Sequence, residues 1–437
     1  MELIPAFFDV FILIKKKYKR KKRERLNFLP IITLIIPVYH SRDTLYECIK
    51  AVNDSDYDNS AIQIMLVDNG SDDGSYEVFL QCREEFSDLV MDWMHSKQGK
   101  SKALNMALFN ATGKYIIHID SDGILEKHAL YNMVEMFERN EDVHCATGTI
   151  LTRPEYIDQT KNFFMRLIRK VEFFEYCQAF LAGRNFESES NSVFTLSGAF
   201  SAFRKSTILK TQLYNTDTVC EDTHITFQVR ETLGKKISLC SNAIFFVDPI
   251  ETMNRLYTQR QRWQQGELEV YHMFDQNKKL GKGGFARNFL IRLIIFDHTF
   301  AFPRMIWYFA LLTLLALNYP LKLIIVSYAL IYFLSFISAL NFKFCIEGFL
   351  DEFPDLQKYV RRKWYLPILY PLFNFMVFWF RMAGVINSVT GTRSWKTKDM
   401  TQEKEEIEKV YNKDMGFLKR FRERARTFVN AENKKSV

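Results

Sequence analysis

The sequence predicts an α/β domain with a doubly wound parallel sheet, followed by membrane helices. Between about residues 31 and 125, short apolar runs alternate with segments whose apolar residues recur at helical spacing. Such runs are typical of parallel strands that are buried on both faces. Beyond about residue 287 the chain turns strongly apolar, which predicts lipid-embedded helices. With 437 residues, the chain has room for a catalytic domain of roughly 250 residues and further elements.

The first strand is predicted at Ile31–Pro37, and Thr44 is a candidate N-cap for a helix that buries Leu45, Cys48, Ile49 and Val52. The next elements in order are strand Ile62–Val67, a turn-rich loop at 68–74, a weaker strand Val90–Met94, helix Lys102–Asn110 and strand Tyr115–Ile119. The second half is less regular. It predicts a helical stretch Tyr156–Ala182, a strand or turn within Phe194–Phe203, and a helix Thr223–Thr232.

The membrane part begins with Asn288–Phe302, whose charged residues favour a position in the membrane interface. Phe302–Leu317 and Leu321–Phe342 flank an Asn-Tyr-Pro turn and predict a helical hairpin, and Tyr365–Val389 is a third long apolar stretch. The basic clusters favour a cytoplasmic tail. Three spans would place that tail outside, so one segment is expected to be re-entrant or interfacial.

The formal net charge of +8 has a local origin, because residues 15–25 carry nine basic side chains and one acidic. A compact basic run beside an apolar segment is typical of an anchor at anionic lipid headgroups, and it disfavours nucleic-acid binding. The preceding segment Leu3–Ile14 is short for a span and contains Asp9, so an interfacial helix is preferred to a tilted span. The seven cysteines form no Cys-x-x-Cys pair, which argues against a disulfide scaffold or a zinc site.

Carboxylates follow two of the predicted strands directly. Asp68 ends one strand, and Asp120 and Asp122 follow another. Ligands of parallel α/β sheets gather at the carboxyl ends of the strands, where such a pair can hold Mg²⁺ or Mn²⁺. A solvated turn is the alternative for the Asp-Ser-Asp-Gly sequence, and the neighbouring Asp68 favours the functional interpretation.

Three further motifs each leave a choice open. Gly99–Asn105, with two lysines before a helix, suits a diphosphate or is a solvated loop. Glu221-Asp222 offers a general base, or simply an acidic first helical turn. In the string Gln259-Arg260-Gln261-Arg262-Trp263, the spacing groups Gln259, Arg262 and Trp263 into one polar and aromatic patch, which suits a sugar substrate or an interfacial belt.

Taken in order, these motifs, with Pro37-Val38-Tyr39 at the end of the first strand, resemble those of family 2 glycosyltransferases. The resemblance is to the processive membrane branch: cellulose, hyaluronan, chitin and poly-N-acetylglucosamine synthases. It covers about residues 30–270 and implies a GT-A-like fold. The chain's length and short N-terminus also resemble a bacterial subset associated with exosortase systems. Unlike many members, it lacks a pair of full N-terminal spans and a cellulose-synthase regulatory domain.

The resemblance implies a role for each motif residue. Pro37, Tyr39 and Asp68 hold the uridine base, Lys100 approaches the diphosphate, and Asp120 lies near the ribose. Asp122 binds the divalent cation, Asp222 is the catalytic base of an inverting displacement, and Arg262 steadies the leaving diphosphate. The implied acceptor-binding residues are Ser197, Gly198, Glu221, Gln259 and Trp263.

The expected domains are a short apolar segment and basic anchor (1–29), a GT-A glycosyltransferase domain (30–275), interfacial and transmembrane helices (276–390) and a charged tail (391–437). The expected function is transfer of a sugar from a UDP-sugar to a growing polysaccharide at the inner (plasma) membrane, with the catalytic domain cytoplasmic. The alternatives are single transfer to a polyprenyl-phosphate lipid or glycolipid, and a non-catalytic nucleotide-binding scaffold. Expected partners are the donor, the acceptor, membrane lipid and an accessory membrane subunit, without nucleic acid.

Overall fold

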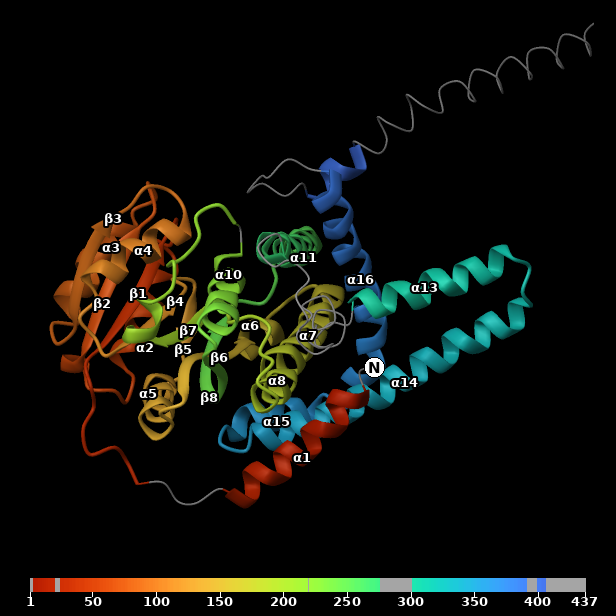
Figure 1. The fold of residues 1–437 in the computed structure, drawn as a ribbon, viewed down its shortest axis with the longest axis horizontal. Coiled ribbons are helices and arrows are strands. Elements are labelled where there is room, and N and C mark those ends of the chain that lie inside the picture. The colour runs from red at the N-terminus through yellow and green to blue at the C-terminus, as the bar shows by residue number, and fades with distance from the viewer. Residues whose placement is uncertain (1–2, 20–23, 219, 276–300, 391–398, 406–437) are drawn as a thin grey trace, which may run out of the picture. The chain divides into compact units, whose positions relative to one another are not determined.

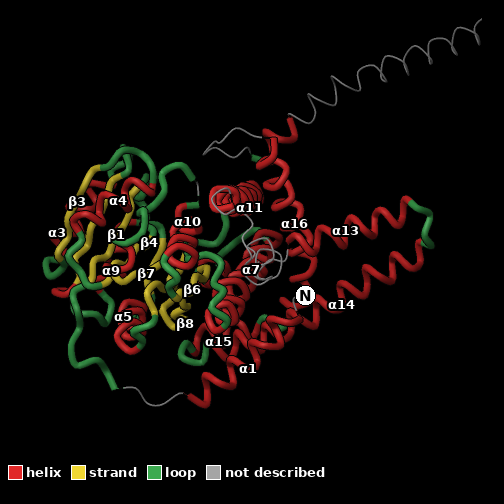
Figure 2. The backbone as a smooth tube through the Cα atoms, viewed as in Figure 1, coloured by secondary structure: helices red, strands yellow, loops and turns green. Residues whose placement is uncertain are grey.

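A computed structural model describes residues 3–19, 24–218, 220–275, 301–390 and 399–405. Its centre is an eight-stranded mixed sheet with the order β3-β2-β1-β4-β7-β6-β8-β5 (Figures 1 and 2). The strands are β1 (Ile32–Val38), β2 (Ile62–Asp68), β3 (Val90–His95), β4 (Tyr115–Ile119), β5 (Gly123–Leu125), β6 (Val143–Thr152), β7 (Phe200–Arg204) and β8 (Lys236–Val247).

The first half of the sheet is parallel and confirms the strands predicted from the apolar runs. β1 pairs in parallel with β2 and β4, and β2 pairs in parallel with β3. The register places Val38 beside Asp68 and Asp68 beside His95, so the ends of three strands meet at one edge. The connecting elements are α2 (Leu45–Asn53), the 3₁₀ turn η1 (Asn59–Ala61), α3 (Ser75–Glu85), α4 (Lys100–Asn110) and α5 (Ala129–Arg139).

The second half of the sheet departs from the expected all-parallel arrangement. β7 lies between β4 and β6 and is antiparallel to both, and β5 is antiparallel to β8. β7 is fully buried apart from Arg204, and Phe203 joins a core cluster with Ile35, Leu104 and Ile116. Because β7 pairs with β4, the Ser197-Gly198 turn that precedes β7 lies at the end of β4, next to Asp120.

The second half of the domain also contains helices, several of which pack against β6, β7 and β8. They are α6 (Pro154–Asp158), α7 (Phe163–Cys177), the π-helical η2 (Gln178–Gly183), α8 (Arg184–Glu189), α9 (Lys205–Ile208), α10 (Glu221–Phe227) and the π-helical η3 (Gln228–Thr232). The single helical stretch predicted over Tyr156–Ala182 is divided near Asn162, whose side chain accepts a hydrogen bond from the Met165 amide and caps α7. The helix predicted at Thr223–Thr232 begins two residues earlier and ends as a π-helix.

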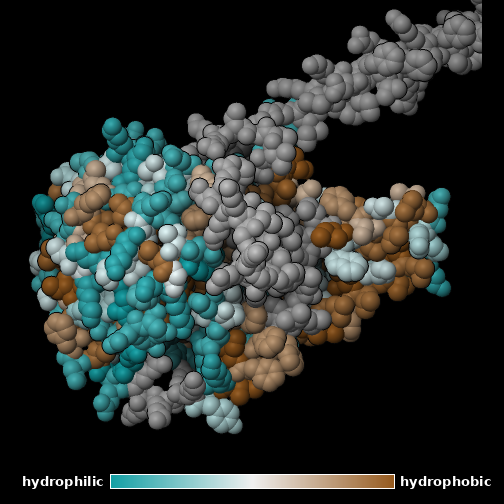
Figure 3. Space-filling model, viewed as in Figure 1, coloured by the Kyte–Doolittle hydropathy of each residue, from teal (hydrophilic) through white to brown (hydrophobic). Residues whose placement is uncertain are grey.

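The apolar segments form the long helices α1 (Leu3–Lys19), α13 (Ala301–Ala316), α14 (Leu321–Phe349) and α16 (Leu366–Thr390). The short amphipathic helix α15 (Pro354–Arg362) lies between α14 and α16 in the sequence. Leu321–Phe349 and Leu366–Asn387 are long and apolar enough to cross a membrane, whereas Ile306–Ala316 is shorter. Apolar side chains cover the α13–α14 hairpin in Figure 3, as expected for a surface that faces lipid. α1 packs along α14, where a Cβ at Gly348 would overlap the side chain of Leu13.

Two compact units divide the chain. The first comprises residues 1–249 and 266–379, and the second comprises residues 250–265 and 380–437. Helix α11 (Met253–Asp275) contributes to both. In the first unit, Val270 and Phe274 of this helix pack against Phe194 and Phe227. The interfacial segment predicted at Asn288–Phe302 lies almost entirely outside the described residues.

Candidate active site

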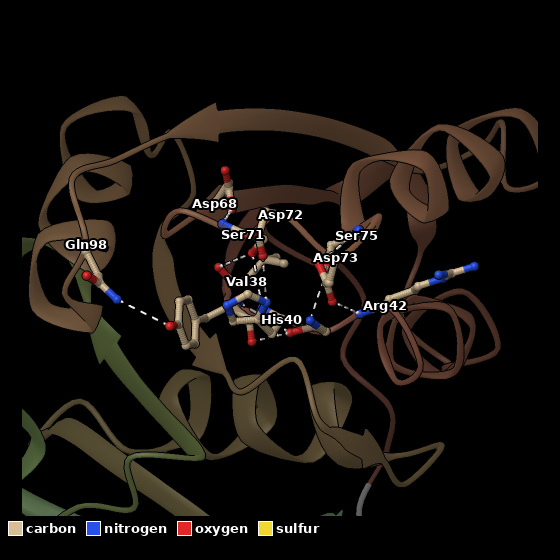
Figure 4. A network of polar contacts seen from close by, with 11 residues as sticks. Val38, His40, Arg42, Asp68, Ser71, Asp72, Asp73, Ser75 and Gln98 are labelled. Carbon is tan, nitrogen blue, oxygen red and sulfur yellow. Dashed lines mark hydrogen bonds and ion pairs between the residues drawn. The ribbon is translucent and has the colours of Figure 1, made fainter. Parts of the chain in front are cut away.

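The ends of β1 and β2 carry a buried acid with several polar neighbours (Figure 4). Asp68 is 7% exposed, and its carboxylate accepts a hydrogen bond of 2.9 Å from the Ser71 amide and lies 3.1 Å from Nδ1 of His95. Burial alone raises the pKa of Asp68, but the hydrogen bonds from Ser71 and the contact with His95 outweigh it and lower the pKa. The carboxylate is therefore ionised at neutral pH and can accept a further hydrogen bond from a nucleotide base.

The other two residues predicted to hold a nucleotide base lie at the end of β1. Pro37 is buried within the strand, whereas Tyr39 is 48% exposed. The Tyr39 hydroxyl accepts a 3.3 Å hydrogen bond from the Gln98 side chain, so the ring is tied to the loop before α4. An exposed aromatic ring near an ionised acid offers a stacking surface for a base.

The acids that follow Asp68 have a structural role. Asp73 accepts hydrogen bonds from the Arg42 amide (2.9 Å) and from the amide and hydroxyl of Ser75, where α3 begins (Figure 4). Asp72 lies 3.4 Å from the His40 imidazole. These contacts fix the loop between β2 and α3 against the end of β1, and they keep Asp68 in place.

Lys100, at the start of α4, connects three parts of the chain. Its ammonium group donates hydrogen bonds to the Asp120 carboxylate and to the Gly198 carbonyl (2.9 Å), and lies 3.8 Å from the Glu221 carboxylate. Burial alone lowers the pKa of Lys100, but the Asp120 and Glu221 carboxylates outweigh it and raise the pKa. Lys100 is therefore a fixed positive charge at the helix N-terminus, where a diphosphate is favoured.

Asp122 follows Asp120 in the turn after β4. Its side chain is exposed, and it makes no hydrogen bond or ion pair with another described side chain. Partial desolvation by the surrounding protein and the neighbouring Asp120 raise the pKa of Asp122 to about 6. An open carboxylate beside a like charge suits a hard divalent cation, which takes one or two protein carboxylates together with substrate phosphates. Among the described residues, no group of three or more His, Cys, Asp or Glu side chains is placed to hold a metal ion.

Glu221 and Asp222 open α10 at the same edge of the sheet. Glu221 is buried, and Asp222 accepts a 2.7 Å hydrogen bond from the Thr223 amide. A Cβ at Gly198 would lie 2.9 Å from Oδ2 of Asp222, so the Ser197-Gly198 turn packs directly on this carboxylate. Burial raises the pKa of both acids, and the Lys100 charge opposes that rise. An acid with a raised pKa in a partly closed site suits proton transfer.

Two buried residues of this site were missed by the sequence motifs. His118 in β4 donates from Nε2 to the Gly198 carbonyl (2.7 Å), and its Nδ1 lies 2.8 Å from the Ser201 hydroxyl. Because burial and then Lys100 lower the pKa of His118 to about 4, the ring is neutral. Thr147 in β6 accepts from the Ser197 amide (3.0 Å) and from the Arg184 guanidinium (3.2 Å). His118 could have been found from the sequence, because a histidine stands out in an otherwise apolar strand. No sequence feature distinguishes Thr147.

The string that runs from Gln259 to Trp263 lies on the part of α11 that belongs to the second unit. Arg262 is exposed and Gln259 and Trp263 are partly buried. The Arg260 guanidinium lies 4.4 Å from the centre of the Trp263 ring and donates to the Gln259 side chain (2.6 Å). Arg260 therefore connects Gln259 and Trp263 within their own unit.

The mixed sheet with its acidic carboxyl edge is GT-A-like, and a solved structure shares this fold. A mannosyltransferase from Pyrobaculum calidifontis, in complex with GDP-Man and Mn²⁺, superimposes with a TM-score of 0.55 at 15% identity, covering 89% of this chain and 95% of that one.

Comparison of sequences gives the family. Residues 33–209 match the family model of Glycosyl transferase family 2. A poly-beta-1,6-N-acetyl-D-glucosamine synthase from Staphylococcus aureus is 25% identical over 277 residues, which are 61% of this chain and 64% of that protein. The synthase of the same name from Staphylococcus epidermidis is 23% identical over 263 residues, 60% of this chain and 59% of that protein. The match thus spans less than two thirds of these relatives. Residues 33–209 thus correspond to a family 2 glycosyltransferase domain.

Proposed function

We propose that this protein is a membrane-bound, inverting glycosyltransferase that transfers a sugar from a UDP-sugar to a growing polysaccharide. The observation that carries the proposal is the charge arrangement around Gly198. Lys100 bonds to its carbonyl, Asp222 lies against its Cα, and Asp120 and Glu221 flank the lysine. The Lys100 ammonium, which can face a departing diphosphate, therefore lies near Asp222, which can face an attacking hydroxyl.

In the proposed reaction, Asp222 takes the proton of the acceptor hydroxyl as the oxygen attacks the anomeric carbon of the donor sugar. The bond from that carbon to the UDP oxygen breaks, with inversion at the carbon. Lys100 stabilises the negative charge that develops on the diphosphate. Asp68 and Tyr39 hold the base, and Asp120 lies by the ribose. A divalent cation at Asp122, when bound, supplies further neutralisation of the diphosphate.

The remaining roles are proposed from the motif resemblance. Arg262 steadies the leaving diphosphate, and Gln259 and Trp263 hold the acceptor sugar, for which tryptophan offers a flat apolar surface. The chain resembles proteins named as poly-beta-1,6-N-acetyl-D-glucosamine synthases, which supports a polysaccharide product and makes N-acetylglucosamine the first donor sugar to test. We also propose the division into segments 1–29, 30–275, 276–390 and 391–437, with the catalytic domain on the cytoplasmic side because the basic run 15–25 favours that side.

The test is UDP release by the purified full-length chain in lipid nanodiscs, across a panel of UDP-sugars with Mg²⁺ or Mn²⁺. One UDP-sugar should release UDP and yield a product that grows with time on a sizing gel. A product of one added sugar that extracts into organic solvent would instead indicate transfer to a lipid. No release with any donor, from protein that still binds UDP, would contradict the proposed function and favour a nucleotide-binding scaffold.

A further inference from the structure

The first half of α11 presents two different faces. Tyr257, Gln261 and Gln264 are spaced by four and three residues, so they lie along one side of the helix. Gln259, Arg262 and Trp263 share the opposite side by the same spacing rule. The five-residue string is thus divided, with Gln261 pointing away from the three residues proposed to bind substrate.

The end of α16 packs closely against the first of these faces, within the same unit. A Cβ at Gly384 would lie 2.6 Å from the Gln261 carbonyl oxygen, so only a glycine allows this approach of the two helices. Arg381, three residues earlier, donates a 3.2 Å hydrogen bond to the Gln264 side chain. The Phe380 ring meets the Tyr257 ring edge to face at 5.2 Å. The contact is therefore both tight and polar.

A carboxylate from the tail completes this packing. Glu403, in the helical segment 400–405, accepts hydrogen bonds from the Tyr257 hydroxyl, from the Gln261 side chain (2.9 Å) and from the Asn387 side chain (2.7 Å). Tyr257 and Gln261 belong to α11, whereas Asn387 belongs to α16. One carboxylate thus joins α11, the end of α16 and the tail segment. Hydrogen bonds to a charged acceptor are stronger than neutral ones and fix geometry more tightly.

We propose that Glu403 is a positioning residue for the Gln259–Trp263 string. It sets the rotation of α11 by holding the face that carries Tyr257 and Gln261, and so aims the face that carries Gln259, Arg262 and Trp263. This rests on the proposed function, in which that second face binds the acceptor and the leaving diphosphate. The tail then contributes to catalysis without contacting substrate, and a loosened α11 releases the acceptor early.

The test compares E403A and E403Q with a matched control, E405A, in the full-length chain. Glu405 is two residues away on the same segment and is exposed, so its removal changes charge without touching α11. We expect E403A to lower kcat by at least about ten-fold and to shorten the product, because small misplacements of substrate-holding groups cost this much. The donor KM should stay within about two-fold, and E403Q, which keeps one acceptor oxygen, should lie between E403A and wild type.

Hydrogen exchange of backbone amides provides a second measurement, which does not depend on enzymatic activity. The amides of residues 257–264 should exchange faster in E403A than in wild type and E405A, because local opening follows the loss of tertiary contacts. Exchange and product length both unchanged in E403A would overturn the proposal. So would a donor KM that rises in step with the fall in kcat, which would indicate general damage. If wild type transfers no sugar, the proposed function fails, while the exchange comparison still decides whether Glu403 holds α11.

Discussion

The Cα atom of Gly198 faces the carboxylate of Asp222 so closely that a Cβ at this position would lie 2.9 Å from Oδ2. The carbonyl of the same residue accepts hydrogen bonds from Lys100 (2.9 Å) and from His118 (2.7 Å). One peptide unit therefore separates the proposed base from the lysine that faces the diphosphate. Its position fixes the spacing between the two groups that must act on opposite ends of the reacting sugar bond.

This contact predicts the behaviour of G198A. The added methyl group should push the Asp222 carboxylate away from its present position, because 2.9 Å is well inside van der Waals contact for carbon and oxygen. We expect kcat to fall by about ten-fold to a hundred-fold while the affinity for UDP, measured by calorimetry, changes little. Wild-type turnover in G198A would show that Asp222 does not need this position.

Replacing Asp222 by asparagine tests its role as the base directly. D222N keeps the shape of the side chain and its acceptor oxygen for the Thr223 amide, but it cannot take a proton. We expect transfer to fall by on the order of a thousand-fold or more, with UDP binding retained. D217N is the matched control, because Asp217 is an exposed acid on the loop before α10. Loss of activity in both D222N and D217N would indicate that removal of a negative charge, and not loss of the base, lowers the activity.

The pH dependence should respond to Lys100. The base acts only when ionised, so activity should fall on the acid side as it becomes protonated. Burial raises the pKa of Asp222 and of Glu221, and Lys100 lowers both. Removing the lysine charge in K100M must therefore raise these pKa values and move the acid limb of kcat/KM to higher pH. If the acid limb of kcat/KM does not shift in K100M, neither Asp222 nor Glu221 controls that limb.

Much of this site could be predicted because it depends on local order in the sequence. Asp68 and Asp120 end apolar strands, and the ends of parallel strands necessarily meet at one edge. Lys100 begins α4, a helix that the sequence predicts from Lys102 onward. The motif resemblance named Ser197 and Gly198, but the contacts that their turn makes could not be predicted. Ser197 meets Thr147 only because β7 inserts between β4 and β6, and strand pairing at this separation leaves no periodic signal.

The other unpredicted features have the same origin. The antiparallel direction of β7 depends on its neighbours, because a short buried strand carries no signal of its own direction. Glu403 is one acid among several in a charged tail, and only the approach of α16 to α11 distinguishes it from Glu405. Sequence periodicity describes one element at a time, whereas these contacts join elements that lie far apart in the chain.

Cation dependence should itself depend on pH, because a metal ion and a proton compete for Asp122. Its pKa of about 6 means that the carboxylate is mostly protonated below that pH and ionised above it. From that pKa, half-activation should need about four-fold more Mn²⁺ near pH 5.5 than near pH 7.5. Chelation with EDTA should abolish transfer, and added Mn²⁺ should restore it in wild type but not in D122A. A half-activating concentration that does not change between the two pH values would exclude Asp122 as the ligand.

The exposed apolar surface of α14 predicts insertion into a bilayer. Leu330 is 56% exposed and lies near the middle of a helix long enough to span. A charge there costs about 2.5–3.5 kcal/mol in a membrane and nothing comparable in water, so L330R should reduce the fraction that resists alkaline extraction from membranes. F109K is the control: Phe109 is 75% exposed on α4, away from the long apolar helices, and its replacement should leave extraction unchanged. Equal extraction of L330R and wild type would show that α14 does not face lipid at this position.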